Sequence, residues 1–384
     1  MPTIITARRL LTDIGSVEFP VLIVGDDGTL TDISSDPTSL AHEEDTLTSA
    51  FFDVHTHGAM GHDVMSASPA ELRMVQHFLA RHGVAQYLPT TVTAPVDSTL
   101  RALESLADAI EAEPQPLQAQ PRGIHLEGPF LSHAKRGVHP AGDLQKPSIE
   151  LFDRFQQAAR GHICLLTIAP ELSGAKELIA YATSLGVRCS LGHTDALANE
   201  AHAGIDAGAT SATHTFNAMR ALNHREPGVL GVTLDSEKLY AELICDGVHV
   251  APELVRLWLR SKGTGRAILV TDAMSAAGMP EGRYKLGELD VDVADGRATL
   301  AGDPERGAHT LAGSVLTMDR AVANLRQFTG ASIAEATRLA SHNPATMLGR
   351  PELTRLAPGG MANLNRFDAS GRLVATYLQG ELVT

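Results

Sequence analysis

The sequence has few cysteines and no long apolar run. Its cysteines are Cys164, Cys189 and Cys245, and an odd number in strand-like apolar segments favours buried thiols in a reducing compartment over a disulfide framework. No segment approaches the roughly 20 apolar residues of a membrane-spanning helix. The apolar stretch at the N-terminus is short and interrupted by Arg8 and Arg9, so we expect no signal peptide. These absences predict a soluble, cytoplasmic protein.

Positive charge is also scarce. Lys and Arg number 31 against 45 Asp and Glu, which gives a formal net charge of −14. An acidic surface argues against nucleic acid or an anionic membrane as a partner. A phosphorylated substrate would therefore need a local basic pocket. Hydrophobic residues make up 43% of the 384 residues, enough for the core of one large domain with a small accessory domain.

What is present is a repeated alternation of apolar strand-like segments with helical patterns. Ser68-Pro69-Ala70-Glu71 is a capping box that begins one such helix. Strands that alternate with helices predict a parallel sheet, and eight such units close into a (β/α)₈ barrel of the TIM type. The eight expected strands are Ala50–Val54, Ala85–Val92, Gly123–Leu126, Ile163–Ala169, Val187–Leu191, Ser211–Thr213, Leu239–Ile244 and Ala267–Val270.

The two ends of the chain have a different pattern. Four strand-like segments lie there: Thr3–Leu11, Val21–Ile33, Ala362–Phe367 and Leu373–Leu378. We expect residues 1–49 and 354–384 to form one small β-sandwich domain beside a barrel of residues 50–353. A hairpin is expected at Tyr284–Leu300, with Asp295-Gly296 at its turn. Two helices are expected after it, Ser314–Phe328 and Ile333–Leu339.

Side chains that can bind a metal follow five of the eight expected strands. They are His55 and His57 after the first strand, Glu127 after the third, His193 after the fifth, His214 after the sixth and Asp272 after the eighth. Residues two apart on a strand point the same way, and the carboxyl ends of barrel strands form the rim where active sites are built. Imidazole and carboxylate are ligands of Zn²⁺ and related ions.

Each of these residues alone has an ordinary structural interpretation. A His-x-His can lie on the surface, a single histidine after a strand is often structural, and Asp272 could cap a helix. Glu127 could simply begin a loop. Independent accidents would not all fall at the same end of one barrel, so the pattern predicts a metal site.

The combination resembles the amidohydrolase superfamily. Many members carry a carboxylated lysine on strand four, but Ile163–Pro170 has no lysine, and Glu127 is the expected substitute. That exchange resembles the N-acetylglucosamine-6-phosphate deacetylase family specifically. Further segments match that family: His125–Phe130, Thr213–Met219, Arg225–Gly228, Cys245–His249, Leu269–Ala273 and Leu311–Ser314. The resemblance spans nearly the whole chain.

The resemblance implies a hydrolase that removes the acetyl group from N-acetyl-D-glucosamine 6-phosphate in amino-sugar catabolism and recycling. Glu127, His193 and His214 would hold the principal metal ion. His55 and His57, with Glu127 shared, would hold a second, although some members bind only one. Zn²⁺ is the expected ion, with Fe²⁺, Mn²⁺ and Co²⁺ as alternatives. Asp272 would be the catalytic base and acid.

The resemblance also implies the substrate-binding residues. They are Val138, His139, Asn217, Ala218, Arg225, His249, Leu311, Ala312 and Gly313. His139, with the metal, would polarise the acetamide carbonyl. Arg225 and His249 would bind the phosphate; without the resemblance, we would read Arg225 as a surface ion pair with Glu226. Dimers are usual in the family, and the arginine acts in its own or the neighbouring subunit's site.

Two alternatives remain open: a different amidohydrolase, deaminases included, and a scaffold without activity. The chain could be another amidohydrolase: a deacetylase of a related N-acetyl sugar, or a cyclic amidase such as a dihydroorotase or hydantoinase, against which the missing lysine and the Arg225 loop speak. A deaminase would need base-recognition groups that we do not identify. A non-enzymatic barrel scaffold usually loses ligands, and here every expected ligand is present.

Overall fold

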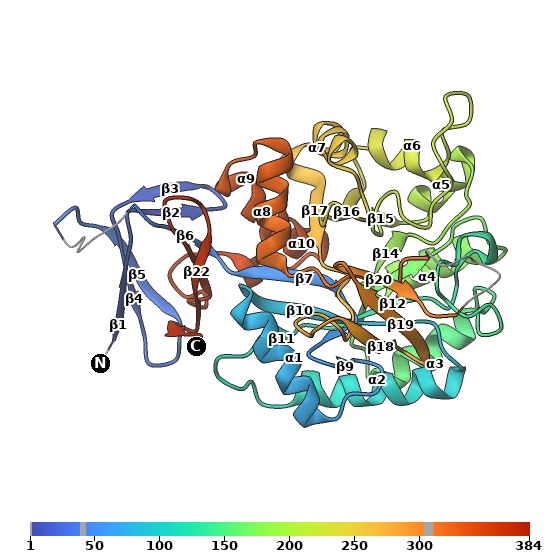
Figure 1. Ribbon diagram of the computed structural model, residues 1–384, viewed down its shortest axis with the longest axis horizontal. Coiled ribbons are helices and arrows are strands. Elements are labelled where there is room, and N and C mark those ends of the chain that lie inside the picture. The colour runs from blue at the N-terminus through green and yellow to red at the C-terminus, as the bar shows by residue number, and fades with distance from the viewer. Residues whose placement is uncertain (1, 39–43, 303–309) are drawn as a thin grey trace.

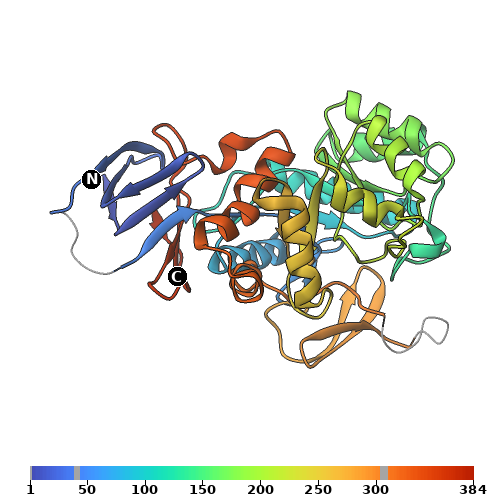
Figure 2. The same cartoon turned by 90° about the horizontal axis from the view of Figure 1, so that it is seen from above.

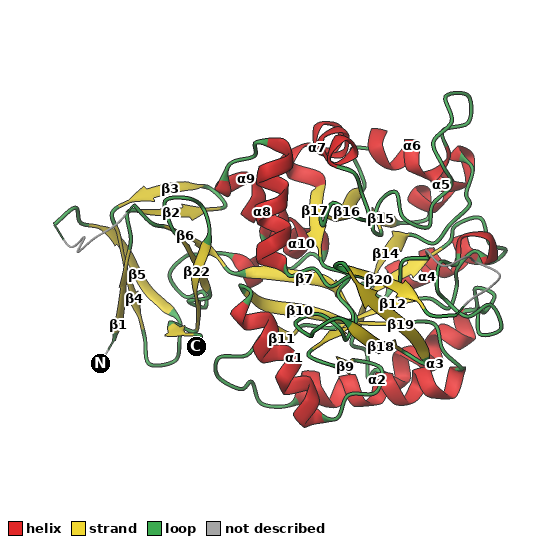
Figure 3. Ribbon diagram, viewed as in Figure 1, coloured by secondary structure: helices red, strands yellow, loops and turns green. Residues whose placement is uncertain are grey.

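Eight parallel strands form the barrel at the centre of the molecule (Figures 1 and 3). The computed structural model describes residues 2–38, 44–302 and 310–384. In spatial order the barrel strands are β7 (Phe51–Thr56), β10 (Val84–Thr91), β12 (Ile124–Glu127), β13 (Ile163–Ile168), β14 (Arg188–Leu191), β15 (Ala209–Ala212), β16 (Tyr240–Ile244) and β17 (Ala267–Val270). All eight expected strands are confirmed. Their apolar side chains pack into two large core clusters.

The barrel closes between its first and last strands just beyond the end of β17. The backbone amide of Asp272 donates to the carbonyl oxygen of His55 at 2.8 Å, and that of His57 donates to Ala273 at 2.7 Å. A parallel bridge joins Thr56 to Ala273. Closure therefore takes place at the rim where the metal-binding side chains were expected.

Helices follow most of the barrel strands and cover the outside of the barrel (Figure 3). They are α1 (Pro69–Arg81), α2 (Val96–Glu111), α3 (Ile149–Ala158), α4 (Ala175–Ser184), α5 (Ala198–Asp206), α6 (Gly228–Asp235), α7 (Pro252–Arg266), α8 (Met318–Thr329), α9 (Ile333–Ala340) and α10 (His342–Met347). The expected capping box is present at α1, where the Ser68 hydroxyl accepts from the Glu71 amide. No helix among the described residues is long and apolar enough to cross a membrane.

Helix α8 begins four residues later than the sequence suggested. The apolar pattern pointed to a start at Ser314, but the Ser314 amide donates to the carbonyl oxygen of Asp272 at 2.7 Å. Ser314 also forms a parallel bridge with Ala273. The segment from Leu311 therefore continues along the barrel rim, and the helix forms only after the chain has left it.

Strands from both ends of the chain form two sheets beside the barrel, where Figure 1 also shows both termini. One sheet has the order β23-β22-β21-β6-β2-β3 and the other β1-β4-β5. The expected strand Thr3–Leu11 is in fact two strands, which belong to different sheets. The bounds are β1 (Thr3–Thr6), β2 (Arg9–Thr12), β3 (Gly15–Glu18), β4 (Pro20–Val24), β5 (Leu30–Ser35), β6 (Thr46–Ser49), β21 (Leu364–Phe367), β22 (Leu373–Leu378) and β23 (Glu381–Leu382).

A third sheet lies beside the barrel mouth and appears as orange strands in Figure 2. It consists of β18 (Gly282–Leu286), β19 (Leu289–Ala294) and β20 (Arg297–Leu300), so the expected hairpin is a three-stranded antiparallel sheet. Asp295 and Gly296 form the predicted turn, with φ values of 50° and 70°. The remaining short elements are β8 (Gly58–Ala59), β9 (His62–Asp63), β11 (Gln120–Pro121) and the 3₁₀ helices His133–Lys135 and Pro351–Thr354.

Candidate metal centre and active site

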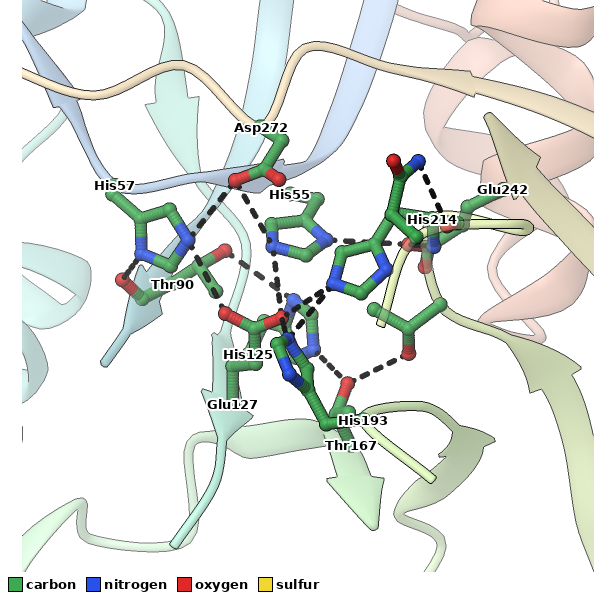
Figure 4. A network of polar contacts seen from close by, with 12 residues as sticks. His55, His57, Thr90, His125, Glu127, Thr167, His193, His214, Glu242 and Asp272 are labelled. Carbon is green, nitrogen blue, oxygen red and sulfur yellow. Dashed lines mark hydrogen bonds and ion pairs between the residues drawn. The ribbon is translucent and has the colours of Figure 1, made fainter. Parts of the chain in front are cut away.

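The polar side chains at the strand ends meet in one buried cluster (Figure 4). Its members are His55 on β7, His57 directly after it, Glu127 at the end of β12, and His193, His214 and Asp272 just after β14, β15 and β17. Side chains from five strands reach one place because the carboxyl ends of all barrel strands lie at the same rim. The structure thus brings together all six residues that the sequence proposed for metal binding and catalysis.

Glu127 lies at the centre of the cluster. Its Oε1 is 3.1 Å from His214 Nε2 and 3.3 Å from His193 Nε2, while its Oε2 is 3.3 Å from His57 Nε2. The Nε2 atoms of His193 and His214 are themselves 3.0 Å apart. One carboxylate oxygen and two imidazole nitrogens therefore face a common point, and the other oxygen faces a second group.

The second group contains His55, His57 and Asp272. Asp272 Oδ1 lies 3.6 Å from His55 Nε2 and 3.2 Å from His57 Nε2. The candidate ligand atoms of these three residues all lie within 4.8 Å of one another. Glu127 Oε1 is 3.5 Å from His55 Nε2, so Glu127 lies between the two groups and can serve both.

The histidine tautomers suit metal ligands. His57 Nδ1 donates to the carbonyl oxygen of Thr90 at 2.9 Å, and His193 Nδ1 donates to that of Lys135 at 3.0 Å. A carbonyl can only accept, so Nδ1 carries a proton, and in the neutral ring that binds a metal the Nε2 lone pair points into the cluster. The buried Nε2 of His55 has no hydrogen-bond partner within residues 2–38, 44–302 and 310–384. These donors fit a divalent ion of the zinc type.

His139 has the opposite tautomer, although it too lies close to Glu127. The backbone amide of Thr93 donates to His139 Nδ1 at 3.2 Å. An amide can only donate, so Nδ1 carries no proton and Nε2 carries one. That Nε2 lies 3.7 Å from Glu127 Oε2. His139 therefore offers a hydrogen-bond donor at the site, where the other imidazoles offer lone pairs.

The electrostatics of the cluster favour a cation. Burial alone would raise the pKa of Glu127, but His55 and the other facing imidazoles hold that pKa well below its usual range. Burial likewise opposes ionisation of Asp272, yet His55 and His57 lower its pKa. Burial would lower the pKa of His57, but Asp272 and Glu127 raise it to about 9. Two buried carboxylates thus attract positive charge to a dry site.

The backbone is strained at three of these residues. His193, His214 and Asp272 have φ values of 48°, 28° and 49°. These values lie in the left-handed region, which residues other than glycine rarely adopt. Each of them is the second residue beyond the end of a barrel strand. Such strain persists only where surrounding contacts enforce it, and here it accompanies the turn of each side chain towards the cluster.

Three buried polar residues behind the cluster had no role in the sequence interpretation. Glu242 Oε2 lies 3.2 Å from His55 Nδ1. Asp53 Oδ2 accepts from the Thr271 hydroxyl at 2.5 Å, and its Oδ1 lies 3.3 Å from the His55 amide. A charged residue within an apolar strand was the available signal for Glu242 and Asp53.

His125 lies beneath the cluster and does not join it. Its Nε2 is 2.7 Å from Thr167 Oγ1 and its Nδ1 is 3.3 Å from Thr90 Oγ1. Its ring packs edge-on against His55, with centroids 4.6 Å apart. Burial and the neighbouring His55 lower the pKa of His125 well below its usual value. His125 therefore supports the floor of the site as a neutral side chain.

A cavity of about 290 Å³ opens above the cluster. Seven of the nine residues expected to bind substrate line it: Val138, His139, Asn217, Ala218, His249, Leu311 and Gly313. Ala312 is fully buried and packs against the core of the third sheet instead. Arg225 is exposed and does not line the cavity. The described lining residues include no Lys or Arg.

The family model and the most similar relatives that we compared indicate the same protein family. The model of the amidohydrolase family matches residues 46–383. The chain is 36% identical to an N-acetylgalactosamine-6-phosphate deacetylase of Escherichia coli O157:H7, over 100% of both chains. It is 37% identical to the N-acetylglucosamine-6-phosphate deacetylase of Bacillus subtilis, over 80% of this chain and 77% of that protein.

Solved structures agree with this. An N-acetyl-D-glucosamine-6-phosphate deacetylase mutant from Mycobacterium smegmatis, in complex with N-acetyl-D-glucosamine-6-phosphate, has a TM-score of 0.92 at 33% identity, covering 100% of this chain and 99% of that one. The N-acetylglucosamine-6-phosphate deacetylase of Thermotoga maritima has a TM-score of 0.88 at 32% identity, covering 99% of each chain.

Proposed function

The chain belongs to the amidohydrolase family, and from this membership we propose that it hydrolyses the acetamide of N-acetyl-D-glucosamine 6-phosphate. The products are acetate and D-glucosamine 6-phosphate. The observation that carries the proposal is the meeting of Glu127, His193 and His214 below the cavity, with Asp272 facing them. The names of relatives that match over most of the chain supply the substrate class.

The chain's own residues hold the metal in two groups. Glu127, His193 and His214 hold the principal ion, and His55 and His57, with Glu127 shared, hold a second. Zn²⁺ is the proposed native ion, because the donors are imidazoles and carboxylates. A bound divalent ion would lower the pKa of its water towards about 7 and would place positive charge beside the carbonyl.

Asp272 moves the proton. Its carboxylate lines the cavity and lies beside both metal-binding groups, where a water attacking the acetamide carbon must pass. Oδ1 or Oδ2 takes the proton from that water and returns it to the departing amine nitrogen. One carboxylate thus acts first as general base and then as general acid.

His139 stabilises the oxyanion. Because the Thr93 amide donates to its Nδ1, its Nε2 carries the proton and donates to the carbonyl oxygen as negative charge develops there. A donor fixed in advance in a buried site costs no reorganisation during the reaction. His139 itself is 2% exposed.

The phosphate of the sugar needs positively charged side chains. The described residues that line the cavity of one chain include no Lys or Arg. Arg225 lies on an exposed segment together with Leu222, which is 53% exposed. We therefore place Arg225 of the partner subunit against the phosphate in a homodimer, where a guanidinium offers several donors. His249 adds a donor from within the cavity, and Asn217 and the Ala218 backbone bind sugar or phosphate oxygens.

The 4-epimer of the substrate is the second candidate. The relative from Escherichia coli O157:H7 that matches over the full length is named for N-acetylgalactosamine 6-phosphate. The two sugars share the acetamide and the phosphate and differ only at C4. The metal centre and Arg225 would serve both equally, so discrimination depends on the cavity wall.

The reaction belongs to the breakdown and recycling of amino sugars in the cytoplasm. A phosphorylated sugar is charged and stays in the compartment where it is made. The three cysteines are free and buried, which suits a reducing compartment.

One assay tests these proposals together. Acetate release is measured with N-acetylglucosamine 6-phosphate, its 4-epimer and unphosphorylated N-acetylglucosamine, each with and without a chelator. We expect chelator-sensitive release from a phosphorylated sugar and little from the unphosphorylated one. The ratio of kcat/KM values for the two epimers decides between the two candidates. No release from either phosphorylated sugar by metal-loaded protein would overturn the function.

A further inference from the structure

Glu242 is a fully buried carboxylate whose role the mechanism leaves open. It lies on β16 within Tyr240–Ile244, and its exposed fraction is 0%. Ile244 lines the cavity, and residues two apart on a strand share a face, so Glu242 points into the barrel interior below the cavity. A buried charge is costly unless it is paired, so its contacts indicate what it does.

Among the described residues, both hydrogen bonds of the Glu242 carboxylate go to proposed metal-binding residues through one oxygen (Figure 4). Oε2 accepts from His55 Nδ1 at 3.2 Å and from the backbone amide of His214 at 3.3 Å. The other oxygen, Oε1, makes no hydrogen bond among the described residues. Glu242 thus orients His55 so that its Nε2 faces Glu127 and Asp272, 3.5 and 3.6 Å away.

His55 differs in this respect from the other oriented ligands. His57 and His193 donate Nδ1–H to neutral backbone carbonyls, whereas His55 donates to an anion. A carboxylate behind a histidine fixes its tautomer and makes Nε2 a stronger ligand. It also adds a third carboxylate beside Glu127 and Asp272. One divalent cation carries too little positive charge to neutralise three carboxylates, whereas two divalent cations carry enough.

We propose that Glu242 is a positioning residue that makes His55 a metal ligand and so determines whether His55 and His57, with Glu127 shared, hold a second ion. The inference rests on the metal-dependent function proposed above, but it concerns the number of ions and needs no substrate. The first group, with Glu127, His193 and His214 side chains, depends on Glu242 only through one backbone amide.

The substitution E242Q separates charge from hydrogen bonding. Because both donors meet the same oxygen, a glutamine carbonyl placed there keeps both hydrogen bonds and removes only the charge. Glu242→Leu removes both. The matched control is Asp45→Asn, another buried carboxylate, which pairs with Arg366 in the terminal sheets.

The test counts ions and measures their affinities. Apoproteins are titrated with Zn²⁺ in competition with a chromogenic chelator, metal content is measured after dialysis, and melting of the apoproteins verifies folding. We expect two ions per wild-type chain. In E242Q the first should bind within about three-fold of wild type and the second about 10–100-fold more weakly. Glu242→Leu should hold one ion and Asp45→Asn two.

A double variant tests the route through His55. The His55→Asn variant should bind only one ion. In the double variant with E242Q, the affinity for that remaining ion should be the same as in His55→Asn. The proposal is overturned if wild type binds one ion, if E242Q binds both ions normally, if folded E242Q loses both ions equally, or if E242Q weakens the remaining ion in His55→Asn. Normal ion counts without deacetylation would refute the proposed function and leave this inference standing.

Discussion

The backbone amide of Asp272 donates to the carbonyl oxygen of His55 at 2.8 Å. This bond joins the first and last barrel strands and also places the proposed proton carrier beside a proposed metal ligand. Closure of the barrel and assembly of the site are therefore the same structural event. Damage to the closure should disturb the chemistry as well as the stability.

Thr271→Val tests that connection. The substitution removes the hydroxyl that donates to Asp53 Oδ2 at 2.5 Å and leaves a buried carboxylate short of a partner. We expect the free energy of unfolding to fall by about 1–3 kcal/mol, with a loss of turnover. Thr91→Val is the matched control, because the buried Thr91 hydroxyl has no hydrogen-bond partner in the part of the chain that the structure describes. Equal stability of the two variants in urea denaturation would contradict the expectation.

Asp272→Asn should keep the metal and lose the proton transfer. The amide has nearly the same shape as the carboxylate but cannot accept a proton from water. We expect kcat to fall by roughly 10²–10⁴, while metal analysis finds an unchanged ion content. Turnover close to wild type would refute the role of Asp272 as base and acid.

His139→Phe removes the ring N–H donor while keeping a planar ring, and so distinguishes a hydrogen-bond donor from a metal ligand. Distance alone would allow His139 to bind metal with Glu127 and His193, but the Thr93 amide assigns it the donor tautomer. We expect kcat to fall by roughly 10²–10³ with no loss of bound metal. Loss of an ion from the purified variant would show that His139 is a ligand.

Arg225→Ala should act on the phosphorylated sugar alone. We expect KM for N-acetylglucosamine 6-phosphate to rise at least about ten-fold, since a charged hydrogen bond contributes about 1.5–3 kcal/mol. The weak reaction of unphosphorylated N-acetylglucosamine is the control and should not change. An equal effect on both sugars would contradict phosphate recognition.

A mixture of two variants tests where Arg225 acts. In a heterodimer of Arg225→Ala with Asp272→Asn, one site has an intact Asp272 and receives Arg225 of the partner subunit. If the arginine acts across the interface, mixing and reassociation should restore a low KM at about one site per dimer. If it acts within its own chain, mixing restores nothing.

Metal removal should reduce both activity and stability. Without a cation, the buried carboxylates Glu127 and Asp272 lose the positive charge that compensates their own negative charge. An ion at 100 times its Kd adds about 2.7 kcal/mol to the free energy of unfolding. Thermal melting with and without chelator measures this, and Zn²⁺ should restore both melting temperature and acetate release. Unchanged melting after verified removal would argue against the site.

Local patterns determined much of this protein in advance. The alternation of strands and helices predicted the eight barrel strands, because each follows from nearby apolar residues and turn signals. The ligand residue types at the strand ends followed from the same pattern, since every strand of such a barrel ends at one rim. The sequence therefore named all six side chains that the structure brings together: His55, His57, Glu127, His193, His214 and Asp272.

Only the tertiary structure decided which of these side chains support one another. His55 and Glu242 are 187 residues apart and meet only through the curvature of the closed barrel. The tautomers of His57, His139 and His193 depend on which distant backbone group each ring meets. The start of α8 was set by backbone pairing of Ser314 with the barrel rim. Such contacts depend on strand register and barrel closure, which no local pattern encodes.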